Sequence, residues 1–275
     1  MRVSRRRCAP AVAGLILLLG SAATSRATAA APAASTLRVA AAASLADAFG
    51  AVARAFEAAH PGTVVRLDLA GSQQLTLQLE QGAAADVFAS ADPRWMDVVR
   101  EHGLVSGEPR VFARNRLVVI VPRDNPAGIE RLQDLAKPGV KVVMGAEAVP
   151  VGAYGRAVLR NLSRAAGFDP DFARRVLANL VSEEESVKSV AGKVQLGEAD
   201  AGLVYRSDVS SALARAVRVL EIPDSANVLA SYPIAVLRDS RSPERAREFV
   251  ALVLSAAGQR LLERHGLMPV ASLTP

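Results

Sequence analysis

Short apolar runs along the chain alternate with segments in which apolar residues recur at helical spacing. The first run covers residues 37–43. A helix pattern over residues 45–60 follows it, with Phe49 and Phe56 on its apolar face. This alternation is typical of βαβ units, so the pattern predicts an α/β fold whose mostly parallel sheets are flanked by helices.

The same rhythm of strands and helices occurs twice. The predicted strands are residues 37–43, 64–69, 86–90, 117–122, 141–144, 201–205 and 231–237. The predicted helices are residues 45–60, 73–81, 93–102, 153–166, 170–177, 186–197 and a long helix from residue 243 through residue 254. We therefore predict two lobes, residues 36–115 plus 232–275 and residues 116–231, joined by two crossover strands that serve as a hinge.

The first thirty or so residues have the parts of a secretory signal. A run of arginines precedes an apolar stretch, residues 11–19, and Ala27-Thr28-Ala29 forms a cleavage signal of the A-x-A type. The stretch is about half the roughly 20 apolar residues that span a bilayer. We predict that residues 1–29 are a signal peptide that is cleaved on export.

The predicted signal peptide holds most of the excess positive charge. The five arginines before Ala30, with no acid among them, are Arg2, Arg5, Arg6, Arg7 and Arg26. Subtracting them takes the formal charge from +6 to +1, so we do not expect a nucleic-acid partner. Cys8 is the only cysteine and lies in the same segment, so the mature chain has no disulfide and no thiolate site.

Patterns that carry catalysis are missing from the sequence. Each of His60, His102 and His265 falls near a predicted helix end, and no pair has metal-ligand spacing. The sequence has no nucleophile elbow, no P-loop and no dinucleotide-binding glycine motif. We interpret Glu183, Glu184 and Glu185 as the solvated first turn of a helix, and we predict that the protein is not an enzyme.

Several predicted strands run directly into a helix that begins with a small hydroxyl residue or a glycine. Ser44, with Asp47 three residues later, matches a capping box. The other junctions are residues 70–72, 149–152 and 186–187. At the carboxyl ends of parallel strands, helix N-termini offer unpaired N–H groups that bind anions. An ordinary helix cap is the alternative at each junction, and only their joint occurrence favours an anion site.

Five segments together resemble the periplasmic molybdate-binding proteins, which are the binding components of molybdate ABC importers. The segments are Ala41 to Leu45 (AAASL), Gly71 to Leu75 (GSQQL), Gln81 to Asp92 (QGAAADVFASAD) with Trp95-Met96, Val149 to Tyr154 (VPVGAY) and Gly197 to Tyr205 (GEADAGLVY). The likeness covers nearly the whole chain after the signal. It implies a two-lobed, type II periplasmic-binding-protein-like fold.

The resemblance also implies a set of oxyanion ligands. Ser44 and Ser72 would each give a hydroxyl and a backbone N–H, Val151 and Val187 would each give a backbone N–H, and Tyr205 would give its hydroxyl. Two features depart from the family pattern: the loop from Gly145 to Val149 is one residue shorter, and Val151 is bulkier than the usual alanine. We interpret the neighbouring Lys188 and Arg206 as solvated.

The function that the resemblance implies is capture of molybdate or tungstate in the periplasm and delivery to the membrane permease of an ABC importer. The protein would act as a monomer, without a cofactor and without any metal other than the bound oxyanion. Three alternatives stay open at this point: another oxyanion such as sulfate or a carboxylate, an enzyme on the same two-lobed fold, and a sensory ectodomain.

Overall fold

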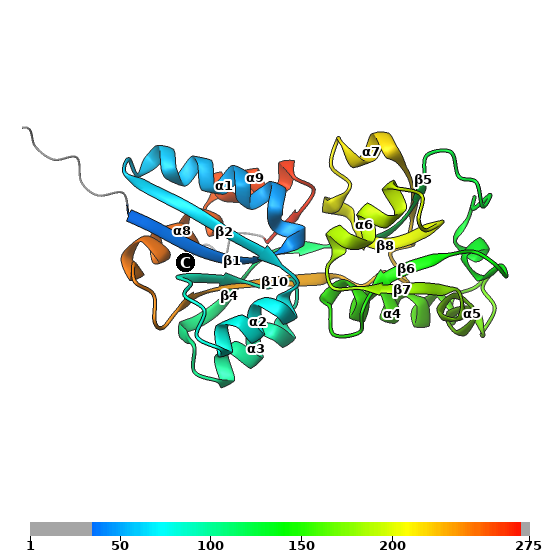
Figure 1. Ribbon diagram of the computed structural model, residues 1–275, viewed down its shortest axis with the longest axis horizontal. Helices are drawn as coiled ribbons and strands as arrows, with labels where there is room; N and C mark the ends of the chain where they lie inside the picture. The colour runs from blue at the N-terminus through cyan, green and yellow to red at the C-terminus, as the bar shows by residue number, and fades with distance from the viewer. Residues whose placement is uncertain (1–34, 271–275) are drawn as a thin grey trace, which may run out of the picture. The chain divides into compact units, whose positions relative to one another are not determined.

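A computed structural model describes residues 35–270 (Figure 1). The predicted signal peptide, residues 1–29, lies outside the described residues. Within residues 35–270, no helix is both long enough and apolar enough to span a membrane.

The first sheet has six strands in the order β11-β4-β10-β3-β1-β2. These strands are β1 (Ser35–Ala42), β2 (Thr63–Ala70), β3 (Val87–Ala89), β4 (Val105–Asn115), β10 (Ala230–Leu237) and β11 (Met268–Pro269). Strand β1 pairs in parallel with β2 and β3, whereas β10 pairs antiparallel with β3 and β4. The carboxyl ends of β1, β2 and β3 therefore lie along one edge of the sheet.

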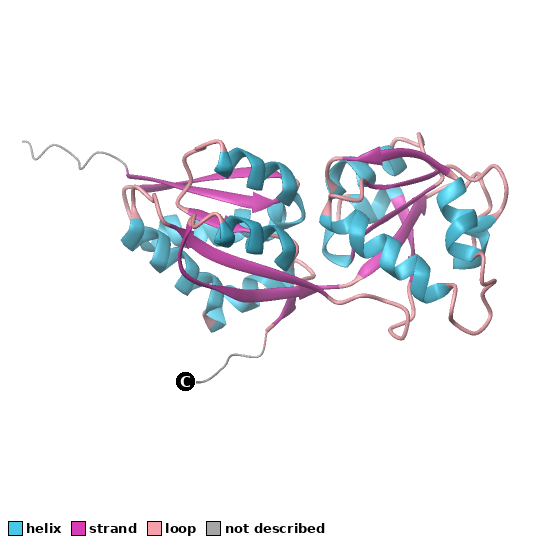
Figure 2. Cartoon of the chain, turned by 90° about the horizontal axis from the view of Figure 1, so that it is seen from below, coloured by secondary structure: helices cyan, strands magenta, loops and turns pink. Residues whose placement is uncertain are grey.

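Helices cover both faces of this sheet (Figures 1 and 2). They are the 3₁₀ helix η1 (Ala43–Leu45) and the α-helices α1 (Ala46–Ala59), α2 (Ser72–Glu80), α3 (Pro93–Glu101), α8 (Pro243–Leu254) and α9 (Ala256–Arg264). Helices α1, α8 and α9 pack together on one face, and α2 and α3 on the other. Phe49 is fully buried, with ring centroids 5.5 Å from Phe112 and 5.9 Å from Phe249, and anchors the core under α1.

The second sheet has five strands in the order β7-β6-β8-β5-β9. Its elements are β5 (Leu117–Pro122), η2 (Leu132–Ala136), β6 (Val142–Gly145), α4 (Pro150–Leu162), α5 (Phe172–Ala178), β7 (Leu180–Glu184), α6 (Val187–Gln195), β8 (Ala201–Tyr205), η3 (Arg206–Asp208), α7 (Leu213–Ala216) and β9 (Val217–Glu221). Strand β6 pairs in parallel with β7 and β8, and β5 pairs antiparallel with β8 and β9.

The chain passes between the sheets twice. Strand β4 ends at Asn115 and β5 begins at Leu117, and the return runs from Glu221 at the end of β9 to Ala230 at the start of β10. The α/β fold with two helix-flanked sheets is as predicted, but the prediction that the sheets are mostly parallel is wrong. Within residues 35–270, three of the five strand pairs of the first sheet and two of the four of the second are antiparallel, because the strands next to the chain crossings, β4, β5 and β10, pair antiparallel with their neighbours. We call the part built on the first sheet lobe 1 and the part built on the second lobe 2.

Two local predictions are wrong. The glutamates at 183 and 184 lie on β7, not in a helix, because this segment pairs with β6 and its carboxylates pair with Arg156 and Lys193. Ser44 caps no helix: it lies inside η1, Leu45 precedes α1, and no side chain caps α1. The Ser44 hydroxyl is instead 3.2 Å from the Tyr232 hydroxyl, a partner far away in the sequence.

Candidate functional site

One small cavity between the lobes is lined by all five residues predicted to bind an oxyanion. The lining residues are Ala42, Ala43, Ser44, Ala70, Gly71, Ser72, Ala91, Val149, Pro150, Val151, Ser186, Val187 and Tyr205. Only about 10 Å³ of the cavity is open to groups the size of a water molecule, far below the roughly 300–1,000 Å³ of pockets for drug-sized ligands. The cavity therefore suits a small ligand that contacts both lobes.

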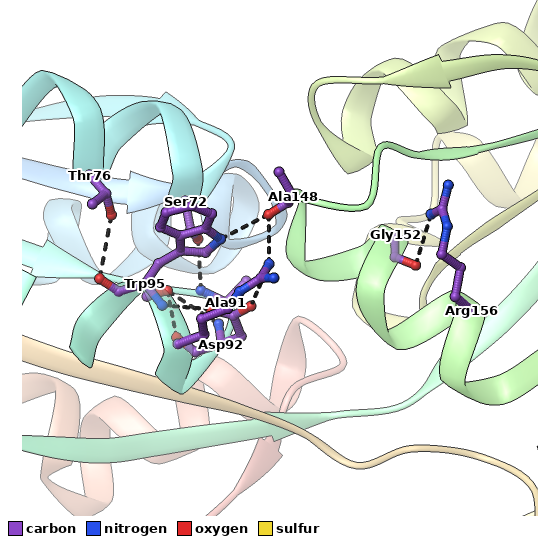
Figure 3. Close-up of polar contacts among 10 residues, drawn as sticks. Ser72, Thr76, Ala91, Asp92, Trp95, Ala148, Gly152 and Arg156 are labelled. Atoms are coloured by element: carbon purple, nitrogen blue, oxygen red, sulfur yellow. Dashed lines mark hydrogen bonds and ion pairs between the residues drawn. The ribbon is translucent and has the colours of Figure 1, made fainter. Parts of the chain in front are cut away.

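Ser72 begins α2 at the carboxyl end of β2 and is buried. Its Oγ accepts a hydrogen bond from the Ala91 backbone N–H at 3.0 Å (Figure 3). Because a backbone N–H can only donate, this bond directs a lone pair of the Ser72 Oγ toward Ala91. The hydroxyl proton of Ser72 is left free to donate to another group. A ligand in the cavity that accepts hydrogen bonds would receive it.

Ser44 is arranged in a similar way by a chain of side chains. Asn115 Nδ2 lies 3.3 Å from the Tyr232 hydroxyl, which lies 3.2 Å from Ser44 Oγ. Since the side-chain amide of Asn115 donates to the Tyr232 hydroxyl, that hydroxyl can donate to Ser44 Oγ. The hydroxyl proton of Ser44 is then free to donate to a ligand, as that of Ser72 is. Burial raises the pKa of Tyr232, so the phenol keeps its proton.

Two helix N-termini of lobe 2 also meet the cavity. Helix α4 begins at Pro150, which has no N–H to leave unpaired, and Val151 follows as the first residue able to donate. Helix α6 begins at Val187, after Ser186, whose Oγ accepts from the Ser189 N–H at 3.2 Å. The first N–H groups of a helix have no partner within the helix and carry the positive end of its dipole. Both termini therefore favour an anion.

Tyr205 ends β8 with a side chain that is fully buried. Within residues 35–270 its hydroxyl has no hydrogen-bond partner. Burial raises its pKa well above the ordinary value, so the group is a neutral donor. A buried donor without a partner costs free energy, and a ligand oxygen would satisfy it. Tyr205 is the strongest single sign that the cavity takes a hydrogen-bond acceptor.

Contacts between the lobes surround the cavity, and sequence reasoning did not find them. Trp95 Nε1 and Arg94 donate to the Ala148 carbonyl oxygen at 2.9 and 2.8 Å (Figure 3). Gln73 Nε2 donates to the Glu185 carbonyl oxygen at 2.9 Å. Trp95 and Gln73 both belong to segments that carry the family likeness, and that likeness was the only signal for these contacts.

The charged groups at the cavity belong to neighbouring residues. Asp208 lies in η3, and its Oδ2 accepts from the Tyr205 backbone N–H at 3.1 Å. Lys188 Nζ is 3.4 Å from Asp208 and 3.7 Å from Asp47, so this lysine is not simply solvated as predicted. Arg206 pairs with Glu221 at 3.5 Å. Within the described residues, neither Lys188 nor Arg206 lines the cavity.

Asp208 gives the protein an expected pH dependence. Burial raises its pKa from 3.8 to about 6, against the opposing effect of Lys188. The folded state therefore binds this proton more tightly than the unfolded state does. The contribution of Asp208 to the free energy of unfolding is full below about pH 4 and falls by on the order of 3 kcal/mol as the pH rises to about 6. Urea denaturation from pH 4 to 8 should show this fall in wild type and a flatter curve for Asp208→Asn. Equal slopes for both proteins would contradict the assignment.

Other kinds of site find little support. Within residues 35–270, no three His, Cys, Asp or Glu side chains group as a metal site. A larger groove beside α1, α9 and η3 contains both arginines and acids, including Arg54, Arg264, Asp47 and Glu263. The lining of the small cavity, by contrast, contains no charged side chain among the described residues.

Comparison with known proteins gives consistent matches. The family model for bacterial extracellular solute-binding proteins matches residues 37–268. The chain is 42% identical over 255 residues to the molybdate-binding protein ModA of Mycobacterium tuberculosis, covering 93% of each chain. Two solved structures share its fold. The periplasmic molybdate-binding protein of Azotobacter vinelandii has a TM-score of 0.73 at 20% identity and covers 86% of this chain and 100% of its own. The sulfate-binding protein SubI of M. tuberculosis has a TM-score of 0.76 at 18% identity and covers 86% and 87%.

Proposed function

Because the chain belongs to the bacterial extracellular solute-binding proteins, we propose that it captures molybdate and delivers it to the membrane permease of an ABC importer. The observation that carries this proposal is the small cavity between the lobes, which is surrounded by neutral hydrogen-bond donors. The identity to a molybdate-binding relative over nearly the whole chain supports the choice of oxyanion.

The donors suit a tetrahedral dianion. Ser44 and Ser72 of lobe 1 each offer a hydroxyl proton whose direction is set by a second hydrogen bond. Val151 and Val187 of lobe 2 offer N–H groups at helix starts, and Tyr205 adds a phenol. Hydrogen bonds to a charged acceptor are stronger than neutral ones. An oxyanion that bonds both lobes stabilises the closed protein, and the two chain crossings take up the motion.

Selection among oxyanions would rest on size. Molybdate, tungstate and sulfate are all dianions with four acceptor oxygens, so the same donors serve each of them. A cavity shaped for the two larger ions would leave the smaller sulfate with long, weak hydrogen bonds. We therefore include tungstate as a ligand and expect sulfate to bind weakly.

The cellular setting follows from the same proposal. The protein would work in the periplasm as a monomer after cleavage of residues 1–29, would need no cofactor, and would carry out no reaction on its ligand. Its partners would be the oxyanion and the permease.

Isothermal titration of residues 30–275 with molybdate, tungstate and sulfate tests the function. We expect one-to-one binding of molybdate and tungstate, and sulfate binding weaker by about a hundredfold or more. Ser72→Ala should weaken molybdate binding by about tenfold, because one donor to a charged acceptor is lost while the backbone N–H remains.

A serine on the surface of the same lobe provides the control. Ser106 is exposed on β4, so Ser106→Ala should bind molybdate like wild type. The proposal fails if none of the three oxyanions binds or if sulfate binds most tightly. Unchanged affinity in Ser72→Ala would remove the cavity from the binding mechanism.

A further inference from the structure

Lys188 and Asp208 form an ion pair next to the cavity. Lys188 follows Val187 at the start of α6, and its ammonium lies 3.4 Å from Asp208 Oδ1. Its second carboxylate partner, Asp47 at 3.7 Å, belongs to α1 of the other lobe. The ammonium is therefore held between the lobes, one residue from a proposed ligand donor.

The buried carboxylate of Asp208 fixes the backbone at Tyr205, but its negative charge disfavours a bound anion. The Asp208 side chain is 0% exposed, and its Oδ2 accepts the backbone N–H of Tyr205, which fixes the end of β8 where the Tyr205 phenol begins. Asp208 also places a negative charge beside a cavity meant for a dianion. Charges at short range in a poorly solvated site interact strongly, so this carboxylate would repel the ligand if nothing offset it.

Lys188 is placed to offset that charge. Three other groups interact electrostatically with Asp208. They are the carboxylate of Asp47 from α1 and the phenols of Tyr205 and Tyr232 from β8 and β10. Both phenols are buried and keep their protons, so the lysine and the two carboxylates set the local charge. The Asp47 side chain is 49% exposed and is screened by water, whereas the charge of Asp208 is not.

We propose that Lys188 is a positioning residue for oxyanion capture, and that its ammonium cancels the charge of Asp208 so that the carboxylate can anchor Tyr205 without repelling the ligand. This inference rests on the proposed function. It assigns no direct bond from Lys188 to the oxyanion. It makes affinity depend on the summed charge of residues 188 and 208.

Four proteins titrated with molybdate at about pH 8 test that dependence. Lys188→Met leaves a charge of −1 and should bind about tenfold more weakly than wild type, whereas Asp208→Asn leaves +1 and should bind about three- to tenfold more tightly. The Lys188→Met/Asp208→Asn double variant returns the sum to zero and should lie within about threefold of wild type. An asparagine carbonyl can still accept the Tyr205 N–H, so the anchor is kept.

The dependence of molybdate affinity on pH separates a role through charge from a purely structural role of Lys188 and Asp208, because a structural role alone would not change it. Wild-type affinity should rise as the pH falls from about 8 to about 5.5, because protonation of Asp208 removes a negative charge beside the ligand, and Asp208→Asn should show a flatter profile. Lys193→Met is the matched control, because Lys193 lies on the same helix, pairs with Glu184 at 2.7 Å and lies outside the cavity lining. It should bind like wild type.

The outcomes separate this inference from the proposed function. If wild type binds no oxyanion, the proposed function fails and the inference fails with it. If wild type binds molybdate and folded Lys188→Met binds equally well, only the role of Lys188 fails. A double variant as weak as Lys188→Met would likewise overturn the charge-sum account.

Discussion

Replacing Gly71 by alanine is expected to weaken molybdate binding by about a hundredfold or more while changing the free energy of unfolding by less than about 1 kcal/mol. A Cβ at Gly71 would lie 2.4 Å from the backbone carbonyl oxygen of Glu185, which belongs to lobe 2. That carbonyl cannot turn aside as a side chain can, so the lobes would have to stay apart. Donors from the two lobes would then no longer reach the same ligand.

Lobe 1 itself should tolerate the added methyl group. Gly71 has φ −62° and ψ 142°, values that alanine adopts without strain. The other close atoms are at the end of the Gln73 side chain, which can move. Isothermal titration and thermal unfolding of the ligand-free protein measure the two effects separately.

Gly192→Ala is the matched control for Gly71→Ala. Within the described part of the chain, no atom outside its own helix lies within 4 Å of a Cβ at Gly192. Because alanine favours a helix more than glycine does, this variant should be slightly more stable and should bind normally. Wild-type affinity in Gly71→Ala would show that ligand binding does not require the close approach of Gly71 to Glu185.

The sequence could predict the strands and helices whose apolar pattern is strong. The buried strands β1, β5 and β8 and the amphipathic helix α1 all lie where the pattern places them. Strand β4 was missed because its residues are mostly charged or exposed, and its pairing with β10 joins segments more than a hundred residues apart. Strand β7 was missed because its glutamates favour a helix start, and only its partners on β6, α4 and α6 make a strand favourable.

The sequence could predict which residues line the cavity, but not the hydrogen bonds that orient them. Strand-to-helix junctions and the family likeness named all five residues that the structure brings together. The partners that aim the serine hydroxyls, Ala91 and Tyr232, come from other parts of the chain and carry no local signal. The same holds for Glu185, whose carbonyl oxygen faces Gly71 only when the lobes are together.

Tyr205→Phe is expected to change stability and binding in opposite directions. In the ligand-free protein, the buried Tyr205 hydroxyl has no partner within residues 35–270, so removing it should stabilise the fold by about 1 kcal/mol. The same change removes a donor to a dianion, which is worth roughly 1.5–3 kcal/mol, so molybdate should bind about thirtyfold more weakly. Urea denaturation without ligand and isothermal titration measure the two effects.

Tyr232→Phe is the informative comparison, because the neighbouring phenol lies 5.7 Å away between ring centroids and is equally buried. Its hydroxyl is satisfied by Ser44 and Asn115, so its loss should destabilise the ligand-free protein by about 1 kcal/mol. Binding should weaken as well, because Ser44 loses the donor that directs its proton. If Tyr205→Phe destabilised the ligand-free protein as Tyr232→Phe does, the Tyr205 hydroxyl would have a partner of its own and would not be a donor held ready for the oxyanion.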